Sequence, residues 1–192
     1  MNAPLNRLII IAAPSGAGKT SVTRHLLNSM PNELAFSISA ATRPPRIHEK
    51  DGVDYYFISP GEFEEKIAAD EFVEWEMVYE GKYYGTLKSE LERIWKAGKA
   101  PLLDVDVVGG VDLQELYPKS SLSLFILPPS IEELRRRLEA RGTETPETLE
   151  ARILKAEHEL SFQDKFDHVI VNDNLERACR EAEQKVREFL GS

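Results

Sequence analysis

An apolar run at residues 8–13 leads directly into a glycine-rich segment and then into a Lys-Thr pair. The segment Ala13-Pro14-Ser15-Gly16-Ala17-Gly18-Lys19-Thr20-Ser21 predicts a buried strand, a tight turn and a helix that begins at the lysine. Backbone N–H groups of such a loop bind phosphate oxygens, and the helix N-terminus adds roughly half a positive charge. We therefore expect Lys19 at the β- and γ-phosphates of a nucleotide and the Thr20 hydroxyl at Mg²⁺. The alternative is an ordinary strand–turn–helix, but a turn alone does not require Lys-Thr at this spacing.

Composition narrows the classes of partner. The formal net charge of −9 over 192 residues leaves no broad basic surface, which argues against nucleic acid as a partner. No apolar run has the length of a membrane span, so we expect no membrane partner. The single cysteine, Cys179, cannot form an internal disulfide and fits a reducing compartment, so we expect a cytoplasmic protein. Whether the chain forms a homo-oligomer stays open.

Apolar runs that alternate with helical patterns predict an α/β fold with a parallel sheet and crossover helices. The expected core strands are residues 7–13, 34–40, 101–106, 122–127 and 168–171, and the expected helices include 19–30, 87–97, 130–140, 146–162 and a final one ending near 190. Between them we expect a short strand at 55–58, a helix from the capping box at Ser59 to about 70, a strand at 72–79 and a turn at 81–85. We predict a single domain over 1–192, with a core of about 1–34, 85–128 and 165–192 and two inserts, about 35–84 and about 129–164.

Two acids end the expected strand at 101–106. In sites built on a phosphate loop, an acid at the carboxyl end of a neighbouring strand holds Mg²⁺ or its water. Asp104 and Asp106 are therefore both candidates, although Asp is also common at turns.

Arginines gather in both inserts. Arg43 and Arg46 lie three residues apart on a proline-stiffened loop, and their forked donors suit a phosphate monoester; a solvated basic loop is the alternative. In the second insert, Arg137 and Arg141 share a helix face and Arg152 lies on the next helix. These three arginines predict a lid that neutralises charge on a transferring phosphoryl group. Solvated helix faces with partners such as Glu133 are equally compatible with the spacing.

Taken together, these segments resemble the guanylate kinase family, P-loop nucleoside monophosphate kinases that phosphorylate GMP with ATP. The resemblance covers nearly the whole chain and rests on 13–20, 39–46, 51–55, 72–75, 83–86, 103–106, 128–130, 137 with 141–143, and 171–173. It implies a three-layer parallel-sheet core of the P-loop NTPase type, a small mixed α/β insert that binds GMP, a helical lid, and Mg²⁺ as cofactor.

The resemblance also implies roles for individual residues. Catalysis would involve Lys19, Arg43, Arg137, Arg141 and Arg152. ATP would be bound by Ala13, Pro14, Ser15, Gly16, Ala17, Gly18, Lys19, Thr20, Ser21, Arg137, Arg141 and Asn172, the last near the adenine. GMP would be bound by Ser39, Arg43, Arg46, Tyr55, Glu74, Tyr84, Thr86, Asp104 and Asp106. Metal would be held by Thr20 and Asp104, while the division of Asp104 and Asp106 between metal and guanine stays open.

The sequence departs from the family pattern at a few positions. Ala13 replaces the first loop glycine, Ala41 a common threonine, His48 a frequent glycine and Val108 a frequent glutamine, and one extra residue lies between Trp75 and Gly81. None of these changes removes a phosphate-binding or metal-binding group.

Two other functions compete with GMP phosphorylation. A non-catalytic, protein-binding module of the same fold would have no need for Gly18-Lys19-Thr20 and the lid arginines. A related sugar-phosphate kinase would keep the loop and lid but has no use for Glu74, a carboxylate placed to bind guanine. Taken alone, however, Glu74 could also be a solvent-facing strand residue.

Overall fold

The computed structural model describes residues 6–79, 81–140, 142 and 145–191. Its core is a five-stranded sheet in the order β2-β7-β1-β8-β9. The strands are β1 (Leu8–Ala12), β2 (Leu34–Phe36), β7 (Ala100–Val105), β8 (Ser121–Leu127) and β9 (His168–Val171). All neighbouring pairs run parallel, so β1 lies at the centre with its carboxyl end between those of β7 and β8. No helix in the described part of the chain is long and apolar enough to cross a membrane.

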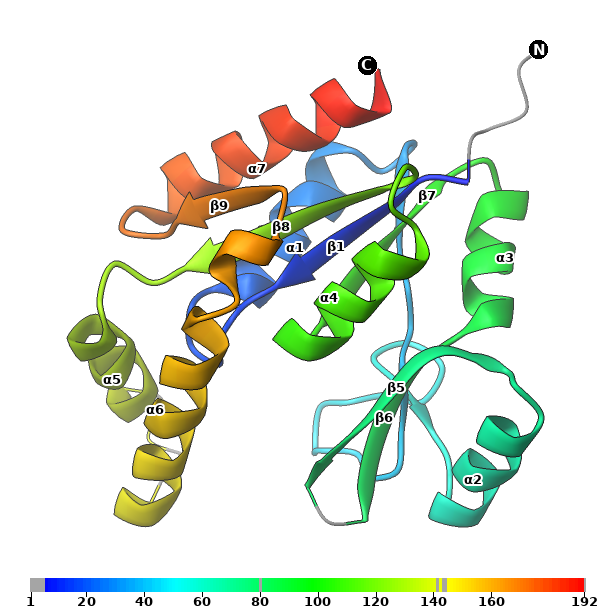
Figure 1. Ribbon diagram of the computed structural model, residues 1–192, viewed down its shortest axis with the longest axis horizontal. Coiled ribbons are helices and arrows are strands. Elements are labelled where there is room, and N and C mark those ends of the chain that lie inside the picture. The colour runs from blue at the N-terminus through cyan, green and yellow to red at the C-terminus, as the bar shows by residue number, and fades with distance from the viewer. Residues whose placement is uncertain (1–5, 80, 141, 143–144, 192) are drawn as a thin grey trace.

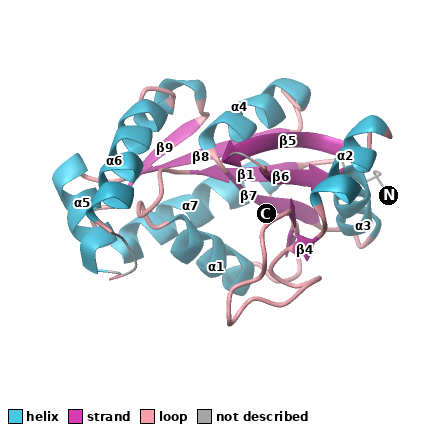
Figure 2. Ribbon diagram, turned by 90° about the horizontal axis from the view of Figure 1, so that it is seen from below, coloured by secondary structure: helices cyan, strands magenta, loops and turns pink. Residues whose placement is uncertain are grey.

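Helices cover both faces of this sheet, as Figures 1 and 2 show. The helices α1 (Lys19–Ser29) and α7 (Leu175–Leu190) pack against Ile9 and Ile11 of β1. On the other face, α3 (Lys88–Lys96) and α4 (Val107–Leu116) cover Leu8 and Ile10. Because successive side chains of a strand point to opposite faces, the uninterrupted apolar run of β1 is what a strand buried on both sides requires.

A second, smaller sheet projects from the carboxyl edge of the core (Figure 1). It has the order β4-β3-β6-β5, with β3 (Ala40–Ala41), β4 (Tyr56–Phe57), β5 (Phe72–Tyr79) and β6 (Lys82–Leu87). The β3–β4 pair is parallel and the other pairs are antiparallel, so the sheet is mixed. Helix α2 (Pro60–Ala68) begins at the predicted capping box of Ser59 and Glu62 and inserts Phe63 between Phe72 and Tyr83. We call residues 40–87 the insert.

Two helices form a second projection beside the loop after β1 (Figure 1). Helices α5 (Ile131–Ala140) and α6 (Pro146–Leu160) pack on each other through Leu134, Leu138 and Ile153, and we call this pair the lid. A 3₁₀ turn (Gln163–Lys165) leads from α6 back to β9. At the start of α5, the Ser130 hydroxyl accepts a hydrogen bond from the Glu133 N–H. The Glu133 carboxylate accepts from Arg136 and Arg137 on the same helix.

The structure confirms the α/β core with its mixed insert and corrects three local predictions. Residues 34–40 are not one strand, because the chain leaves the edge of the core sheet after Phe36 and joins the insert as β3. Of residues 81–85, only Gly81 lies in a turn, whereas the tyrosine-rich residues 82–85 pair with β5 as part of β6. Helix α4 was not predicted at all, because its opening Val-Val-Gly-Gly has low helix propensity. Burial of Val107 and capping by Asp106 override that propensity.

Candidate active site

The glycine-rich loop connects the carboxyl end of β1 to the start of α1. Gly16 and Gly18 have φ values of 95° and 103°, a region that favours glycine, and the Ala17 N–H donates to the Pro14 carbonyl at 3.1 Å. The N-cap of α1 is Gly18, which has no side chain that could bind the first N–H groups of the helix. Those groups are therefore suited to an anion, and Thr20 and Ser21 lie exposed in the same first turn.

Neighbouring segments hold this loop in place. A Cβ atom at Gly16 would lie 3.0 Å from both Leu134 and Leu138, so lid helix α5 packs directly on the loop. The Asn172 side chain is buried and donates to the Ala17 carbonyl at 2.7 Å, and the Asn172 carbonyl accepts from Arg137 at 2.9 Å. The contact of Asn172 in this structure is thus with the backbone of the loop.

Lys19 joins the loop to the end of β7. Its Nζ lies 2.5 Å from Asp104 Oδ1 and donates to the Val105 carbonyl at 2.6 Å. A carboxylate and the Thr20 hydroxyl are hard oxygen ligands of the kind that Mg²⁺ takes together with substrate phosphates. Among the described residues, no group of three or more His, Cys, Asp or Glu side chains is placed to hold a metal without such a substrate.

A second cluster surrounds Arg43 at the start of the insert. Its Nε donates to the Tyr84 hydroxyl at 3.0 Å, and its terminal nitrogens donate to Glu49 at 2.5 and 2.7 Å. The guanidinium also lies 4.9 Å from the centre of the Tyr55 ring. The hydrogen bonds from Arg43 lower the pKa of Glu49 to about 2, so Glu49 is ionised and holds the guanidinium in one orientation.

A third cluster lies along the paired strands β5 and β6. Glu74 is paired with Thr86 across the two strands, and the buried Thr86 hydroxyl donates to Glu74 Oε1 at 2.6 Å. A Cβ atom at Gly109 would lie 2.9 Å from Glu74 Oε2 and 3.4 Å from Asp106 Oδ1, so both carboxyl groups lie over the first turn of α4. Burial raises the pKa of Glu74 to about 7, despite the hydrogen bond from Thr86. Glu74 therefore lies inward rather than toward solvent.

Glu76 lies between Glu74 and the Arg43 cluster, because it is the next residue on the same face of β5. It is paired with Tyr84 across β5 and β6, two residues from Glu74 and on the same face. Its contact with Asp106, together with burial, raises the pKa of Glu76 to about 8. Asp106 itself accepts from the Gly109 N–H at 2.8 Å and caps α4. Asp104 and Asp106 thus differ in position, the first beside Lys19 and the second beside the insert.

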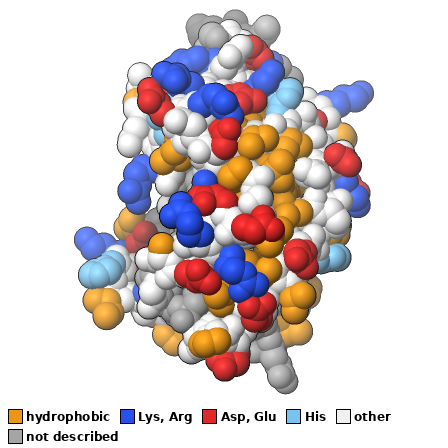
Figure 3. Space-filling view, turned by 90° about the vertical axis from the view of Figure 1, so that its left-hand side faces the viewer, with side chains coloured by type: hydrophobic (Ala, Val, Ile, Leu, Met, Phe, Trp, Pro, Cys, Tyr) orange, Lys and Arg blue, Asp and Glu red, His pale blue; other side chains and the backbone are white. Residues whose placement is uncertain are grey.

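The lid brings two of its three predicted arginines to the loop. Arg152 donates to the Ser15 hydroxyl at 3.0 Å, and Arg137 binds both Glu133 and the Asn172 carbonyl. Arg141 lies outside the described residues. Other lid arginines form surface ion pairs, such as Arg135 with Glu150, and Figure 3 shows cationic and acidic side chains interspersed on this side of the molecule.

Two further predicted GMP residues are less enclosed. The Arg46 side chain is 75% exposed and lies 3.7 Å from Glu49 at the rim of the Arg43 cluster. Ser39 is half-buried, and its carbonyl accepts from the Tyr56 N–H at 2.9 Å.

Sequence reasoning missed Glu49, Glu76 and Gly109. Glu49 had a usable signal, since an acid three residues after Arg46 on the same loop can pair with either arginine. Glu76 is two residues after Glu74, and period-two alternation places both on one face. Gly109 carried no signal of its own, because its close approach to Glu74 depends on the unpredicted helix α4.

Comparison with known proteins matches this chain over nearly its whole length. A family model described as guanylate kinase matches residues 5–189. A guanylate kinase of Bacteroides fragilis is 55% identical over 96% of this chain and 90% of the relative, and one of Salinibacter ruber is 44% identical over 98% and 100%. The crystal structure of guanylate kinase from Anaplasma phagocytophilum matches with a TM-score of 0.78 at 29% identity, covering 98% of this chain and 88% of that one.

Proposed function

Because this chain belongs to the guanylate kinase family, we propose that its functional residues divide among the loop after β1, the insert and the lid. The chain is an ATP:GMP phosphotransferase, which converts ATP and GMP into ADP and GDP. Phosphoryl transfer needs positioning and charge stabilisation rather than a covalent intermediate, so each part is assigned by what its groups can orient or neutralise.

The loop binds the phosphates of ATP. This assignment is supported by the uncapped first turn of α1 and by Lys19 at the carboxyl end of β7. Lys19 now pairs with Asp104, and it exchanges that partner for the β- and γ-phosphates when ATP binds. Asn172 holds the loop through the Ala17 carbonyl, so we assign it a positioning role at the ATP site.

Thr20 and Asp104 hold Mg²⁺, a proposal supported by their oxygen chemistry and by their places beside the loop. Held there, Mg²⁺ would supply positive charge that neutralises the charge developing on the phosphoryl group during transfer. Asp106 is turned toward Glu74 and α4, so we assign it to the guanine side of the site.

The insert binds GMP at two points. Arg43, Tyr55 and Tyr84 converge and supply the donors that a phosphate monoester needs, with Arg46 at the rim. Glu74 carries the choice of base, because an ionised carboxylate accepts two parallel hydrogen bonds from N1–H and the 2-amino group of guanine. Adenine presents an acceptor at N1, which would leave the carboxylate opposite a lone pair.

The lid supplies positive charge at the transferring phosphoryl group. Arg152 and Arg137 already contact the loop and its support, and we place Arg141 in the same role from the resemblance. We also assign the reaction to the cytoplasm, a proposal supported by the single cysteine.

The main support for GMP as the acceptor is the Glu74 carboxylate, which Thr86 holds in place by a hydrogen bond. A coupled assay of ADP release across GMP, IMP, dGMP, AMP and ribose phosphates tests it. We expect GMP to give the highest kcat/KM, IMP an intermediate value because it lacks the 2-amino group, and AMP a value lower by roughly 10⁴-fold. Turnover of a ribose phosphate above GMP would favour a sugar-phosphate kinase, and absence of turnover with every acceptor would favour a binding module.

A further inference from the structure

The insert is joined to the core at two crossings of the chain. At the first, Ser37 still donates to the Leu102 carbonyl of the core sheet, whereas the Ser39 carbonyl already accepts from Tyr56 of the insert. At the second crossing, β6 ends at Leu87 and α3 begins at Lys88. Two crossings by themselves allow one body to shift against the other, so side-chain contacts between core and insert, both near the crossings and along α4, decide where the insert sits.

Glu90 lies in the first turn of α3, between the two crossings. It is 2% exposed, and its carboxylate accepts four hydrogen bonds, two on each oxygen. Oε1 accepts from the Ile38 N–H at 3.1 Å and from Arg93 at 2.6 Å, and Oε2 accepts from the Tyr56 hydroxyl at 3.0 Å and from Arg93 Nε at 3.0 Å. A carboxylate has about four lone-pair positions, so this buried group is fully satisfied.

The hydrogen-bond partners of Glu90 belong partly to the core and partly to the insert and the segment that leads into it. Arg93 belongs to α3, the same core helix as Glu90. Ile38 lies in the first crossing and Tyr56 in strand β4 of the insert, so two of the four bonds link the core helix to segments that lead into or belong to the insert. The loss of Glu90 would leave the Ile38 N–H and the Tyr56 hydroxyl without these partners, which favours a shifted insert.

The same two partners are direct neighbours of residues assigned to GMP. Ile38 precedes Ser39, and Tyr56 follows Tyr55, whose ring packs against Arg43. Misplacement of a substrate by about 1 Å can cost on the order of 10²-fold in rate, so a contact that fixes these backbone segments bears on transfer.

We propose that Glu90 is a positioning residue for the acceptor substrate, which fixes the insert on the core and thereby sets Ser39 and Tyr55 relative to the ATP loop. The inference rests on the proposed assignment of the insert to GMP. Glu90 touches neither substrate in this account, and it acts through Ile38 and Tyr56.

Glu90→Ala tests this inference through a split between the two substrates. We expect KM for GMP to rise about tenfold or more and kcat to fall, while Kd for a non-hydrolysable ATP analogue stays within about twofold, because the loop belongs to the core. Glu90→Gln should restore KM for GMP to within about threefold, since its carbonyl keeps the Ile38 N–H and its amide donates to the Tyr56 oxygen. The bond that it loses is the one from Arg93 Nε, which the amide N–H group would face, and that bond lies within α3 and not between core and insert. Tyr56→Phe should raise KM for GMP about threefold alone and have no further effect in the Glu90→Ala background.

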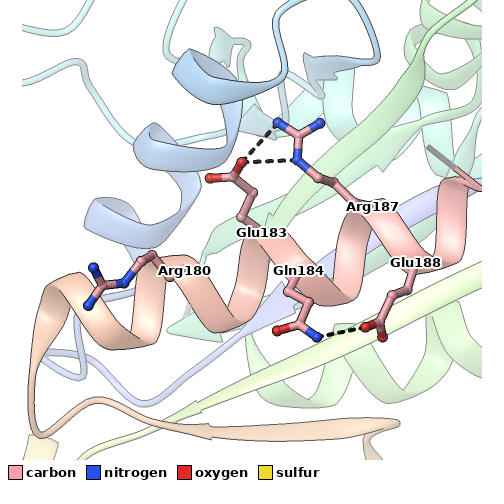
Figure 4. A pocket seen from close by; sticks show the side chains of 5 residues that line it. All are labelled: Arg180, Glu183, Gln184, Arg187 and Glu188. Atoms are coloured by element: carbon pink, nitrogen blue, oxygen red, sulfur yellow. Dashed lines mark hydrogen bonds and ion pairs between the residues drawn. The ribbon is translucent and has the colours of Figure 1, made fainter.

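Glu183 provides the matched control. It accepts hydrogen bonds from Arg187 on its own helix and from His25 on α1. It lines an open surface pocket on α7 (Figure 4), on the side of the core away from the insert (Figure 1). Glu183→Ala should lower the melting temperature without raising KM for GMP.

Three results would overturn the inference: a wild-type KM for GMP in Glu90→Ala, a parallel loss of GMP and ATP-analogue binding, or an equal rise in KM in Glu183→Ala. If Glu90→Ala does not fold, Tyr56→Phe decides, and an unchanged KM for GMP in that variant overturns the inference. Wild-type enzyme in the same assay separates the two proposals, since failure to phosphorylate GMP would refute the proposed function instead.

Discussion

The loop after β1 and the insert, to which we assign ATP and GMP, are built from different parts of the chain. The loop depends on backbone: two glycines with positive φ, a helix start without a side-chain cap, and apolar packing on both faces of the central strand. The insert depends on side chains, with Arg43 held by Glu49 and Glu74 held by Thr86 over a small apolar centre around Phe63. The loop site is therefore formed by one short segment, whereas the site in the insert needs side chains that four strands and their loops bring together. In the proposed function, the first contacts the phosphates of ATP and the second determines which monophosphate is accepted.

Removal of Lys19, the loop side chain that we assign to the β- and γ-phosphates, should have the largest effect. Lys19→Ala should lower kcat by about a hundredfold or more, because the lysine stabilises charge that shifts during transfer. A coupled assay at saturating substrates measures it, with circular dichroism to confirm the fold and Lys119→Ala, an exposed surface lysine, as control. A near wild-type kcat would show that the loop is not the site of transfer.

Glu74→Gln should lower activity nearly as much as Lys19→Ala, but only with GMP as the acceptor. The amide keeps the shape of the carboxylate and turns a donor toward a guanine donor, so kcat/KM for GMP should fall on the order of a hundredfold while AMP changes little. The ratio of kcat/KM for GMP to that for AMP, measured in both proteins, decides it. An unchanged ratio would move guanine recognition to Asp106, Asp104 or Ser39.

The ionisation of Glu74 should also be visible, as a smaller effect, in the pH dependence of kcat/KM for GMP. Glu74 has its pKa raised to about 7 by burial, and only its ionised form accepts both guanine donors. Because kcat/KM reports the free enzyme and the free substrate, its value for GMP should fall about tenfold per pH unit below 7, and more steeply below about 6, where the GMP phosphate takes up a proton. The corresponding profile for Glu74→Gln should lack the inflection near pH 7. If the inflection persisted in that variant, another group would be responsible.

Glu49→Gln should have the smallest effect, on the orientation of one arginine. Its carbonyl keeps one of the two hydrogen bonds from Arg43, but its amide N–H group would face the other Arg43 donor, so that bond is lost and KM for GMP should rise about fivefold with little change in kcat. Initial rates at saturating ATP measure this change. A fall in KM would mean that Glu49 competes with the GMP phosphate for Arg43 instead of positioning it.

The contrast between the two regions also explains what could be predicted from sequence. The loop, the strand expected at 7–13 and the two acids that end the strand at 101–106 carry strong local patterns, and the sheet they imply is confirmed. Only the structure shows that Asp104, and not Asp106, lies beside Lys19. The residues proposed for GMP came mostly from the family resemblance, because their spacing reflects a mixed sheet whose strand β6 was taken for a turn. Glu90 and Gly109 gave no signal, since the burial of one and the close approach of the other exist only after α3 and α4 have packed.

Crossing two variants with two ligands tests whether the ATP site around the loop and the GMP site that the insert shares with Asp106 bind their substrates independently. Calorimetric Kd values for a non-hydrolysable ATP analogue and for GMP are needed in wild type, Lys19→Ala and Glu74→Gln. We expect Lys19→Ala to weaken the analogue about tenfold or more and GMP by less than about twofold, and Glu74→Gln to do the reverse. If either variant weakened both ligands equally, the two sites would not be separable and the division between core and insert would be wrong.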